Sequence, residues 1–352
     1  MARKALAAST CLLLAISTSW VGVAQLARAA EVDSEGLQHR SVVPLLTWAN
    51  ATAWILLALP HMARRIRDKE DVPGSGAVML DLVTTKAFKA SHPPRFLFIA
   101  LTTNFSYIGA LHFLPASLNT AIFSSSPVFT LLLQTVFLPE SGGYGDAAAS
   151  QRWKALSVGL SVVGVLLIAE PWHGSARGSD LTEEQRVLGV LLSLFSALGT
   201  AIYQVYFKHT FGDSMGPDEV GLFLAHMGCW ASALMGAVLW LAVDRGLYAL
   251  DLEEVPWVMV VMTALSSALF NFLIKFGLSR ETPVTTSLGT QIGIPLNFLL
   301  DLFVVHSHFR WPQAVGVLTM LLSFSVWHHS EARGAQAEAR IGGKDASERL
   351  LG

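Results

Sequence analysis

The chain has 352 residues, of which 52% are hydrophobic and only 14% are charged, and its formal net charge is −2. Soluble domains contain about 25% charged residues, so this composition excludes an ordinary soluble domain and indicates an integral membrane protein. No basic, aromatic-rich segment indicates a nucleic-acid partner. The two cysteines, Cys11 and Cys229, both lie in apolar stretches, which excludes a disulfide framework and a thiolate metal site.

Apolar stretches long enough to cross a bilayer recur along the chain as far as residue 329. A transmembrane helix needs roughly 20 such residues. In chain order, the ten predicted spans are 5–27, 43–63, 96–114, 118–138, 154–170, 187–207, 219–243, 256–278, 284–305 and 311–329. The tail at 330–352 is charged, and we expect it to be disordered.

The lysine and arginine residues are divided unequally between the two sides of these spans. With the N-terminus in the cytoplasm, 17 of the 24 basic residues fall on the cytoplasmic side, six fall on the other side, and Lys275 lies within a span. Short loops rich in lysine and arginine face the cytoplasm. We therefore predict a multi-pass protein with both termini cytoplasmic, in the plasma membrane or in a secretory-pathway endomembrane.

The first span has a second interpretation. The basic pair Arg3 and Lys4, the apolar run after it and the small residues at 27–30 also fit a cleaved signal peptide. We favour a retained span, because the apolar run is long for a signal peptide and its loss would leave nine spans.

The two halves of the chain share a sequence pattern. The matching features, in chain order, are Asn104-Phe105, Pro115, Pro127 and Arg152-Trp153 in the first half, and Asn271-Phe272, Pro283, Pro295 and Arg310-Trp311 in the second. We therefore predict an all-α membrane protein whose ten transmembrane helices form two five-helix repeats, at 1–170 and 187–329. Because five is odd, the second repeat is inverted, and inverted repeats place a substrate site near the midplane between them.

Two matched prolines, Pro127 and Pro295, lie near the middle of their spans. Each removes a helical hydrogen bond, which loosens the carbonyls of Phe123 and Gln291. Such carbonyls are tolerated at this depth only where protein, water or a ligand satisfies them. Polar residues gather beside both prolines: Asn119, Thr120, Ser124, Ser125 and Ser126 in the first half, and Thr285, Thr286, Ser287, Thr290 and Gln291 in the second. They either line a substrate path or bond to their own helices and join neighbouring ones.

Ionisable and aromatic residues inside the spans supply further candidates. Lys275 and Asp301 are functional candidates by position, but roughly 20 Å of depth separates them, so we predict no salt bridge. Aromatic faces can hold an organic cation. Four histidines at the membrane edges fit exposed interfacial residues better than a metal site: His306, His308, His328 and His329. The predicted substrate-binding residues are Trp20, Gln25, Asn104, Tyr107, Ser124, Ser125, Tyr203, Gln204, Asn271, Lys275, Thr290 and Gln291.

The chain contains no motif for ATP binding, for a nucleophile elbow or for zinc hydrolysis. Its acidic residues near span ends are scattered over different loops rather than clustered at one site. We therefore predict that the protein is not an enzyme, and we expect no cofactor and no metal. The expected partners are a small-molecule solute and the lipid bilayer, and a homodimer is an open alternative.

Several segments carry a family resemblance, and the most specific is Asn-Phe-Leu-Ile-Lys-Phe-Gly at 271–277. The others are 20–27, 44–54, 199–208, 254–257, 287–289 and 294–297. Together they resemble the drug/metabolite transporter superfamily (EamA-like), and within it most closely the F branch of solute carrier family 35, whose members include proposed thiamine carriers. The resemblance implies a carrier that works by alternating access.

The chain departs from this branch at two positions, Gln204, where the branch favours lysine, and Lys275, where it favours asparagine. A basic group near the cytoplasmic mouth disfavours a cation such as thiamine and favours an anionic solute. We predict a secondary-active carrier of a small organic solute, with thiamine or a related organic cation as one substrate class. The alternatives are a nucleotide-sugar or phosphorylated-metabolite exchanger of an internal membrane, and a non-transporting polytopic scaffold.

Overall fold

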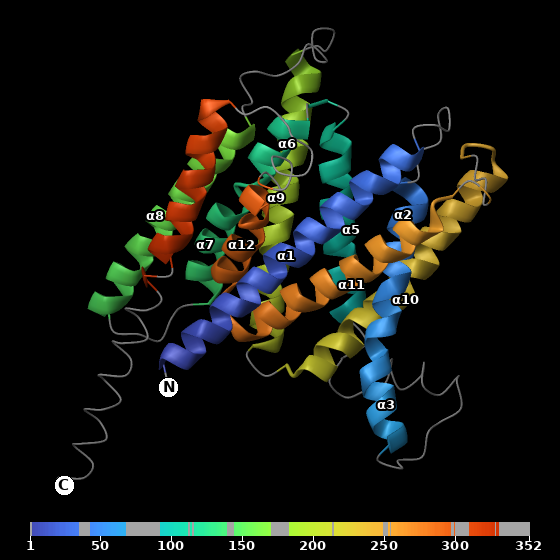
Figure 1. The fold of residues 1–352 in the computed structure, drawn as a ribbon, viewed down its shortest axis with the longest axis horizontal. Helices are drawn as coiled ribbons and strands as arrows, with labels where there is room; N and C mark the ends of the chain where they lie inside the picture. The colour runs from blue at the N-terminus through green and yellow to red at the C-terminus, as the bar shows by residue number, and fades with distance from the viewer. Residues whose placement is uncertain are drawn as a thin grey trace. The chain divides into compact units, whose positions relative to one another are not determined.

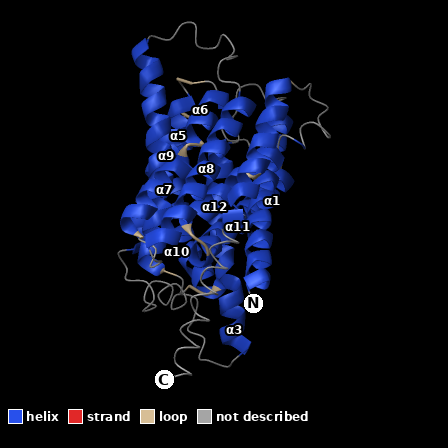
Figure 2. Cartoon of the chain, turned by 90° about the vertical axis from the view of Figure 1, so that its left-hand side faces the viewer, coloured by secondary structure: helices blue, strands red, loops and turns tan. Residues whose placement is uncertain are grey.

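The structure is a computed structural model. It describes residues 2–34, 43–67, 92–111, 113–114, 116–138, 144–169, 183–212, 215–248, 253, 255–296, 299, 310–327 and 329–330. Within these ranges the regular elements are all helices and no strand occurs (Figure 1, Figure 2). This confirms the all-α part of the predicted fold. The predicted tail at 330–352 lies outside the described residues apart from Ser330.

Four of the described helices are long and apolar enough to cross a membrane, at Asn119–Phe137, Glu184–Phe211, Pro217–Asp244 and Trp257–Arg280. Two shorter apolar helices occur at Ala7–Val23 and Trp311–Trp327. Length and composition therefore support a multi-pass membrane protein, whereas the full set of ten inverted spans stays a prediction.

Most predicted spans coincide with one continuous helix. The longest disagreement is at α8, which begins about ten residues before the predicted span because its polar first turns continue the helix. The bounds are α1 Ala2–Ser34, α5 His92–Leu111, α8 Tyr144–Ala169, α9 Glu183–Phe211, α10 Pro217–Asp244 and α11 Trp257–Arg280.

Three predicted spans are not continuous α-helices. The second span divides into α2 (Val43–Ala53), the 3₁₀ helix η1 (Trp54–Ala58) and α3 (Leu59–Arg67). The fourth span divides into α6 (Ala116–Phe123) and α7 (Ser126–Phe137). In the ninth span, α12 (Pro283–Gln291) ends well before the end of the predicted span. Proline explains each interruption, because it has no N–H to donate. In the second span Pro60 cannot bond to the Leu56 carbonyl, which instead accepts from the Leu59 N–H.

The chain forms two compact units. Unit 1 consists of Met1–Ser17, Thr102–Thr210 and Glu281–Gly352, and unit 2 consists of Thr18–Leu101 and Phe211–Arg280. Each unit therefore contains segments from both predicted repeats. The division of the chain into repeats at 1–170 and 187–329 stays a prediction about topology, and it is not the division into compact units.

In unit 1, α8 packs against the helix Trp311–Trp327, drawn in red beside it in Figure 1. Ser157 Oγ donates to the Ser323 carbonyl at 2.8 Å, and Ser323 Oγ donates to the Ser157 carbonyl at 2.8 Å. Two turns along, a Cβ on Gly164 would lie 2.9 Å from the Gly316 carbonyl, and one on Gly316 would lie 2.7 Å from the Gly164 carbonyl. We call these four residues the serine–glycine seam. Its pairing order makes the two helices antiparallel.

In unit 2, α10 packs closely against the second span. A Cβ on Gly228 would lie 3.0 Å from the Ala51 carbonyl, and one on Gly221 would lie 2.6 Å from the Leu57 carbonyl. Glycine therefore permits a backbone approach that a larger side chain would prevent. Trp48 Nε1 also donates to the Ser232 carbonyl at 3.2 Å.

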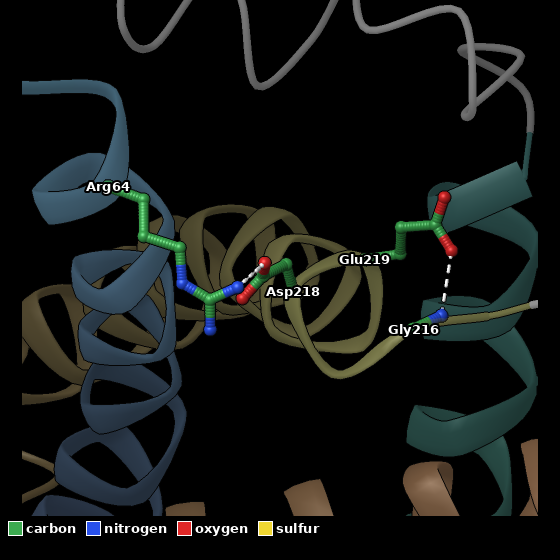
Figure 3. Close-up of polar contacts among 4 residues, drawn as sticks. All are labelled: Arg64, Gly216, Asp218 and Glu219. Atoms are coloured by element: carbon green, nitrogen blue, oxygen red, sulfur yellow. Dashed lines mark hydrogen bonds and ion pairs between the residues drawn. The ribbon is translucent and has the colours of Figure 1, made fainter. Parts of the chain in front are cut away.

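The start of α10 is fixed by polar contacts. Arg64, near the end of α3, forms an ion pair with Asp218 in the first turn of α10, with 2.5 Å between Nη1 and Oδ2 (Figure 3). The Gly216 N–H donates to Glu219 Oε2 at 2.8 Å and caps the helix (Figure 3). The two carboxylates in the first turn also interact favourably with the helix dipole and so stabilise the start of the helix.

Candidate functional site

The break between α6 and α7 lies at Ser124 and Ser125. The Ser125 N–H donates to the Ile122 carbonyl at 3.0 Å, and the Val128 N–H donates to the Ser125 carbonyl at 2.9 Å. Both bonds are one residue shorter than α-helical bonds, so the chain tightens around the residue before Pro127. α6 ends at Phe123 and α12 at Gln291, which are the two residues whose carbonyls the prolines were predicted to loosen.

The two broken spans lie against each other in unit 1. Gln291 Nε2 donates to the Ser124 carbonyl at 2.6 Å, and Gln291 Oε1 accepts from Ser161 Oγ of α8. Farther along, the Val284 N–H of α12 donates to Gln134 Oε1 of α7 at 3.2 Å. Both breaks and α8 therefore meet through the buried Gln291 side chain.

Several predicted hydroxyl ligands instead bond to their own helices. Ser124 Oγ donates to the Thr120 carbonyl at 2.7 Å, Ser125 Oγ to Ile122 at 2.7 Å, and Thr290 Oγ1 to Ser287 at 2.7 Å. These bonds are the alternative that we considered from the sequence. A hydroxyl keeps acceptor capacity after donating, so their role as solute ligands stays a prediction.

A second polar group in unit 1 surrounds Tyr107 on α5. The Tyr107 hydroxyl lies 3.3 Å from Thr120 Oγ1, and Asn119 Nδ2 donates to the Tyr107 carbonyl at 3.1 Å. Ser193 Oγ of α9 donates to the Asn119 carbonyl at 3.2 Å. Asn119 is fully buried, and its Oδ1 has no hydrogen-bond partner among the described residues. A buried acceptor without a partner is costly, so this atom is suited to a donor from a solute or from water.

The other unit 1 candidates lie on α5 and α9. Tyr203 and Gln204 are buried on α9, and Gln204 Oε1 has no hydrogen-bond partner in the described part of the chain. Asn104 is exposed on α5.

Four predicted site residues belong to unit 2. Lys275 is buried, and its Nζ donates to Asn271 Oδ1, one turn earlier on α11, at 3.4 Å. Asn271 Nδ2 in turn donates to the Ser267 carbonyl at 2.9 Å, which holds its oxygen toward the lysine. Trp20 packs on Phe270 with 4.9 Å between ring centroids, and Gln25 is half-buried on α1.

Some sequence candidates receive no structural description. Four of them lie outside the described residues: Asp301, His306, His308 and His328. The prediction that Asp301 forms no salt bridge with Lys275 is therefore not tested by the structure. His329 is exposed, with its ring 6.4 Å from that of Trp153. The described residues contain no group of three or more His, Cys, Asp or Glu side chains arranged to hold a metal.

Sequence reasoning missed Ser161 and Gln134, which both contact α12. A serine or glutamine in an apolar span is a detectable signal, because polar side chains in membranes usually find a partner. The sequence gives no indication of which helix holds that partner. Asn119 was noted only as one of the polar residues beside Pro127.

Comparison with known proteins finds relatives that are named as solute carriers. No protein-family model matches the chain. Solute carrier family 35 member F3 of Mus musculus is 23% identical over 324 residues, which cover 88% of this chain and 70% of the relative. The Homo sapiens member F3 is 22% identical over 328 residues, which cover 89% of this chain and 70% of the relative. Solute carrier family 35 member F5 of Bos taurus is 24% identical over 66% of this chain and 42% of its own length.

One crystal structure superimposes on 91% of this chain and 97% of its own, with a TM-score of 0.59 and 15% sequence identity, a likeness that concerns the fold alone. The relatives are named as solute carriers rather than enzymes, which agrees with the prediction that this chain is not an enzyme. Their agreement over most of the chain identifies it as a relative of the F branch of solute carrier family 35, in the drug/metabolite transporter superfamily.

Proposed function

We propose that the protein is a secondary-active carrier that moves a small organic solute across a membrane by alternating access. The observation that carries this proposal is the meeting of two helix breaks, at Ser124–Ser125 and after Gln291, through the Gln291–Ser124 hydrogen bond. Interrupted transmembrane helices near the bilayer midplane are typical of transporter sites. The similarity to named solute carriers supports the same function.

We propose that the spans form two inverted five-helix repeats, at 1–170 and 187–329. The last spans of the two proposed repeats, α8 and the helix Trp311–Trp327, lie antiparallel along the serine–glycine seam, as expected if the second repeat is inverted. We propose ten spans with both termini cytoplasmic, in the plasma membrane or a secretory-pathway membrane.

The first substrate class that we propose is an organic cation such as thiamine. Tyr107 and Tyr203 of unit 1 supply aromatic faces, which attract cations and stack on flat rings. Asn119 Oδ1 and Gln204 Oε1 are buried acceptors suited to amino or hydroxyl groups of the solute.

The second class is an anionic solute, such as a phosphorylated metabolite or a nucleotide sugar. The observation that favours it is Lys275, a basic side chain that is buried on α11 within a predicted span. Buried charges in membranes usually mark a substrate or ion pathway. The two classes predict opposite consequences of removing this charge.

The experiment that tests the proposal is transport by the purified protein in liposomes. The panel consists of thiamine, thiamine phosphates and nucleotide sugars, each offered with and without an exchange solute inside. We expect saturable uptake or exchange of at least one compound. Failure of every compound under every gradient would favour the polytopic scaffold instead.

The Lys275→Gln variant then separates the substrate classes. If the solute is anionic, we expect its uptake to fall about tenfold or more, since a buried charged hydrogen bond contributes about 1.5–3 kcal/mol. If the solute is a cation, uptake should be unchanged or increased. Folding of the variant, measured by size-exclusion chromatography of the extracted protein, serves as the control.

A further inference from the structure

The side-chain amide of Gln291 is placed between three helices of unit 1. Gln291 is the last residue of α12, and its side chain is 6% exposed. Its Nε2 donates to the Ser124 carbonyl at 2.6 Å, and its Oε1 accepts from Ser161 Oγ. Ser124 and Ser161 are themselves buried, at 4% and 2% exposure. The amide nitrogen and the amide oxygen of Gln291 therefore each form a hydrogen bond within the protein.

The bond to Ser124 replaces a hydrogen bond that the helix break removes. In an unbroken helix the Ser124 carbonyl would accept from the Val128 N–H. Here the Val128 N–H donates to the Ser125 carbonyl instead. A carbonyl left unpaired at this depth is strongly unfavourable, so Gln291 stabilises the broken conformation of the fourth span.

Gln291 itself lies at the matching break of the ninth span. When the two halves of the sequence are aligned so that Pro115 matches Pro283 and Pro127 matches Pro295, the offset is 168 residues in both cases. The same offset aligns Ser124 with Ile292. α12 ends at the residue before Ile292. A side chain at one break therefore satisfies the backbone at the equivalent break of the other half.

We propose that Gln291 is a positioning residue, which holds the two breaks together so that they move as one body and does not bind the solute through its amide. This role differs from the solute contact predicted from the sequence, and its transport part rests on the proposed carrier function. The expected signature is a loss of turnover without a loss of solute affinity.

The first test compares two glutamine-to-methionine variants. Gln291→Met keeps the side-chain length and removes both hydrogen bonds at the breaks. Gln134→Met is the matched control, because Gln134 is also a buried glutamine that joins α7 to α12, through the Val284 N–H, but away from the breaks. We expect Gln291→Met to lower maximal transport about tenfold, the equivalent of one buried hydrogen bond. Its KM should stay within about twofold, and the transport by Gln134→Met should match that of the wild type.

The second test uses Gln291→Glu at different pH values. A protonated glutamic acid can donate to the Ser124 carbonyl, whereas a carboxylate only accepts. The bond is therefore present in acid and is lost as the pH rises. We expect the melting temperature of the extracted variant, relative to the wild type at the same pH, to be highest in acid and to fall as the pH rises. Burial alone also disfavours a carboxylate, so Gln134→Glu is the control, because Gln134 is similarly buried but its oxygen accepts from the Val284 N–H. Its melting temperature should fall less steeply as the pH rises, and an equal fall would count against the bond to Ser124.

Three outcomes would overturn the proposal. They are a raised KM with unchanged maximal transport in Gln291→Met, an equal loss of transport in Gln134→Met, and a pH-independent difference in melting temperature in Gln291→Glu. If the wild type carries no solute, the carrier function fails, but the melting measurement still tests the hydrogen bond between the breaks. If Gln291→Met does not fold, Ser161→Ala tests the same amide from its other side, and unchanged maximal transport in that variant would also count against the proposal.

Discussion

The serine–glycine seam and the junction of the two broken spans both belong to unit 1, and both join matched helices of the two predicted repeats. At the seam, α8 and the helix Trp311–Trp327 are unbroken and meet through small residues and reciprocal serine bonds. At the junction, α6–α7 and α12 are interrupted, and the Gln291 side chain joins the two breaks. Close small-residue packing resists displacement, whereas a helix can bend at a break. We infer that the seam is a rigid contact and that the fourth and ninth spans bend together at the junction, where Gln291 joins their breaks.

The largest expected effect is on the seam itself. Gly164→Ala would place a methyl group against the Gly316 carbonyl and the Met320 side chain. We expect a destabilisation of about 1–3 kcal/mol, typical of overpacking, seen as a lower melting temperature of the extracted protein. Gly159→Ala on the same helix is the control, because nothing lies within 4 Å of its Cβ. Equal melting temperatures for the two variants would contradict the rigid seam.

The second effect is at the junction and concerns transport. Pro127→Ala restores an N–H that can bond to the Phe123 carbonyl and so favours an unbroken fourth span. We expect transport to fall about tenfold while the melting temperature stays equal or rises, because a proline inside a helix is unfavourable. A variant that melts lower and transports normally would show that the break has no part in the cycle.

A smaller effect is expected from the serine pair of the seam. Hydrogen bonds between helices in membranes contribute about 0.6 kcal/mol on average. Ser157→Ala, Ser323→Ala and the double variant should therefore each lower stability modestly, and the two single losses should add, because each hydroxyl donates to the backbone carbonyl of the other serine. A loss in only one of the two single variants would contradict the reciprocal pairing.

The smallest effect is expected at a contact that belongs to neither region, the Arg64–Asp218 ion pair of unit 2 (Figure 3). The Arg64 side chain is 54% exposed, and exposed ion pairs contribute about 0.2–1 kcal/mol. Arg64→Gln should leave the melting temperature nearly unchanged, and any difference should vanish in high salt. A loss as large as that of Gly164→Ala would mean that stability does not concentrate at the seam.

The break positions were predictable because their cause is local. A proline without an N–H affects a carbonyl four residues earlier, and α6 and α12 end at the predicted residues, Phe123 and Gln291. The same rule applied to Pro60 would have located the interruption at η1, a local signal that the span prediction did not use. The early start of α8 at Tyr144 was missed because hydropathy locates the apolar part of a helix and not its polar extension.

The partners of the site residues were not predictable in this way. Gln291 was a candidate from its place beside Pro295, but its bonds to Ser124 and Ser161 span 167 and 130 residues of sequence. A polar residue in an apolar span indicates that a partner exists, and only packing selects it. The same holds for Asn119, whose unsatisfied Oδ1 depends on how α5, α6 and α9 surround it.

The sequence by itself determined the membrane setting, the helical class, the proline breaks and the family resemblance, because composition, hydropathy and proline chemistry act within a few residues along the chain. The tertiary structure decided which helices pair, that Ser157 faces Ser323, and that Gln291 completes the hydrogen bonding of a break in the other half. Those contacts join residues more than 150 positions apart, and they are chosen by the complementarity of whole helix surfaces rather than by any local pattern.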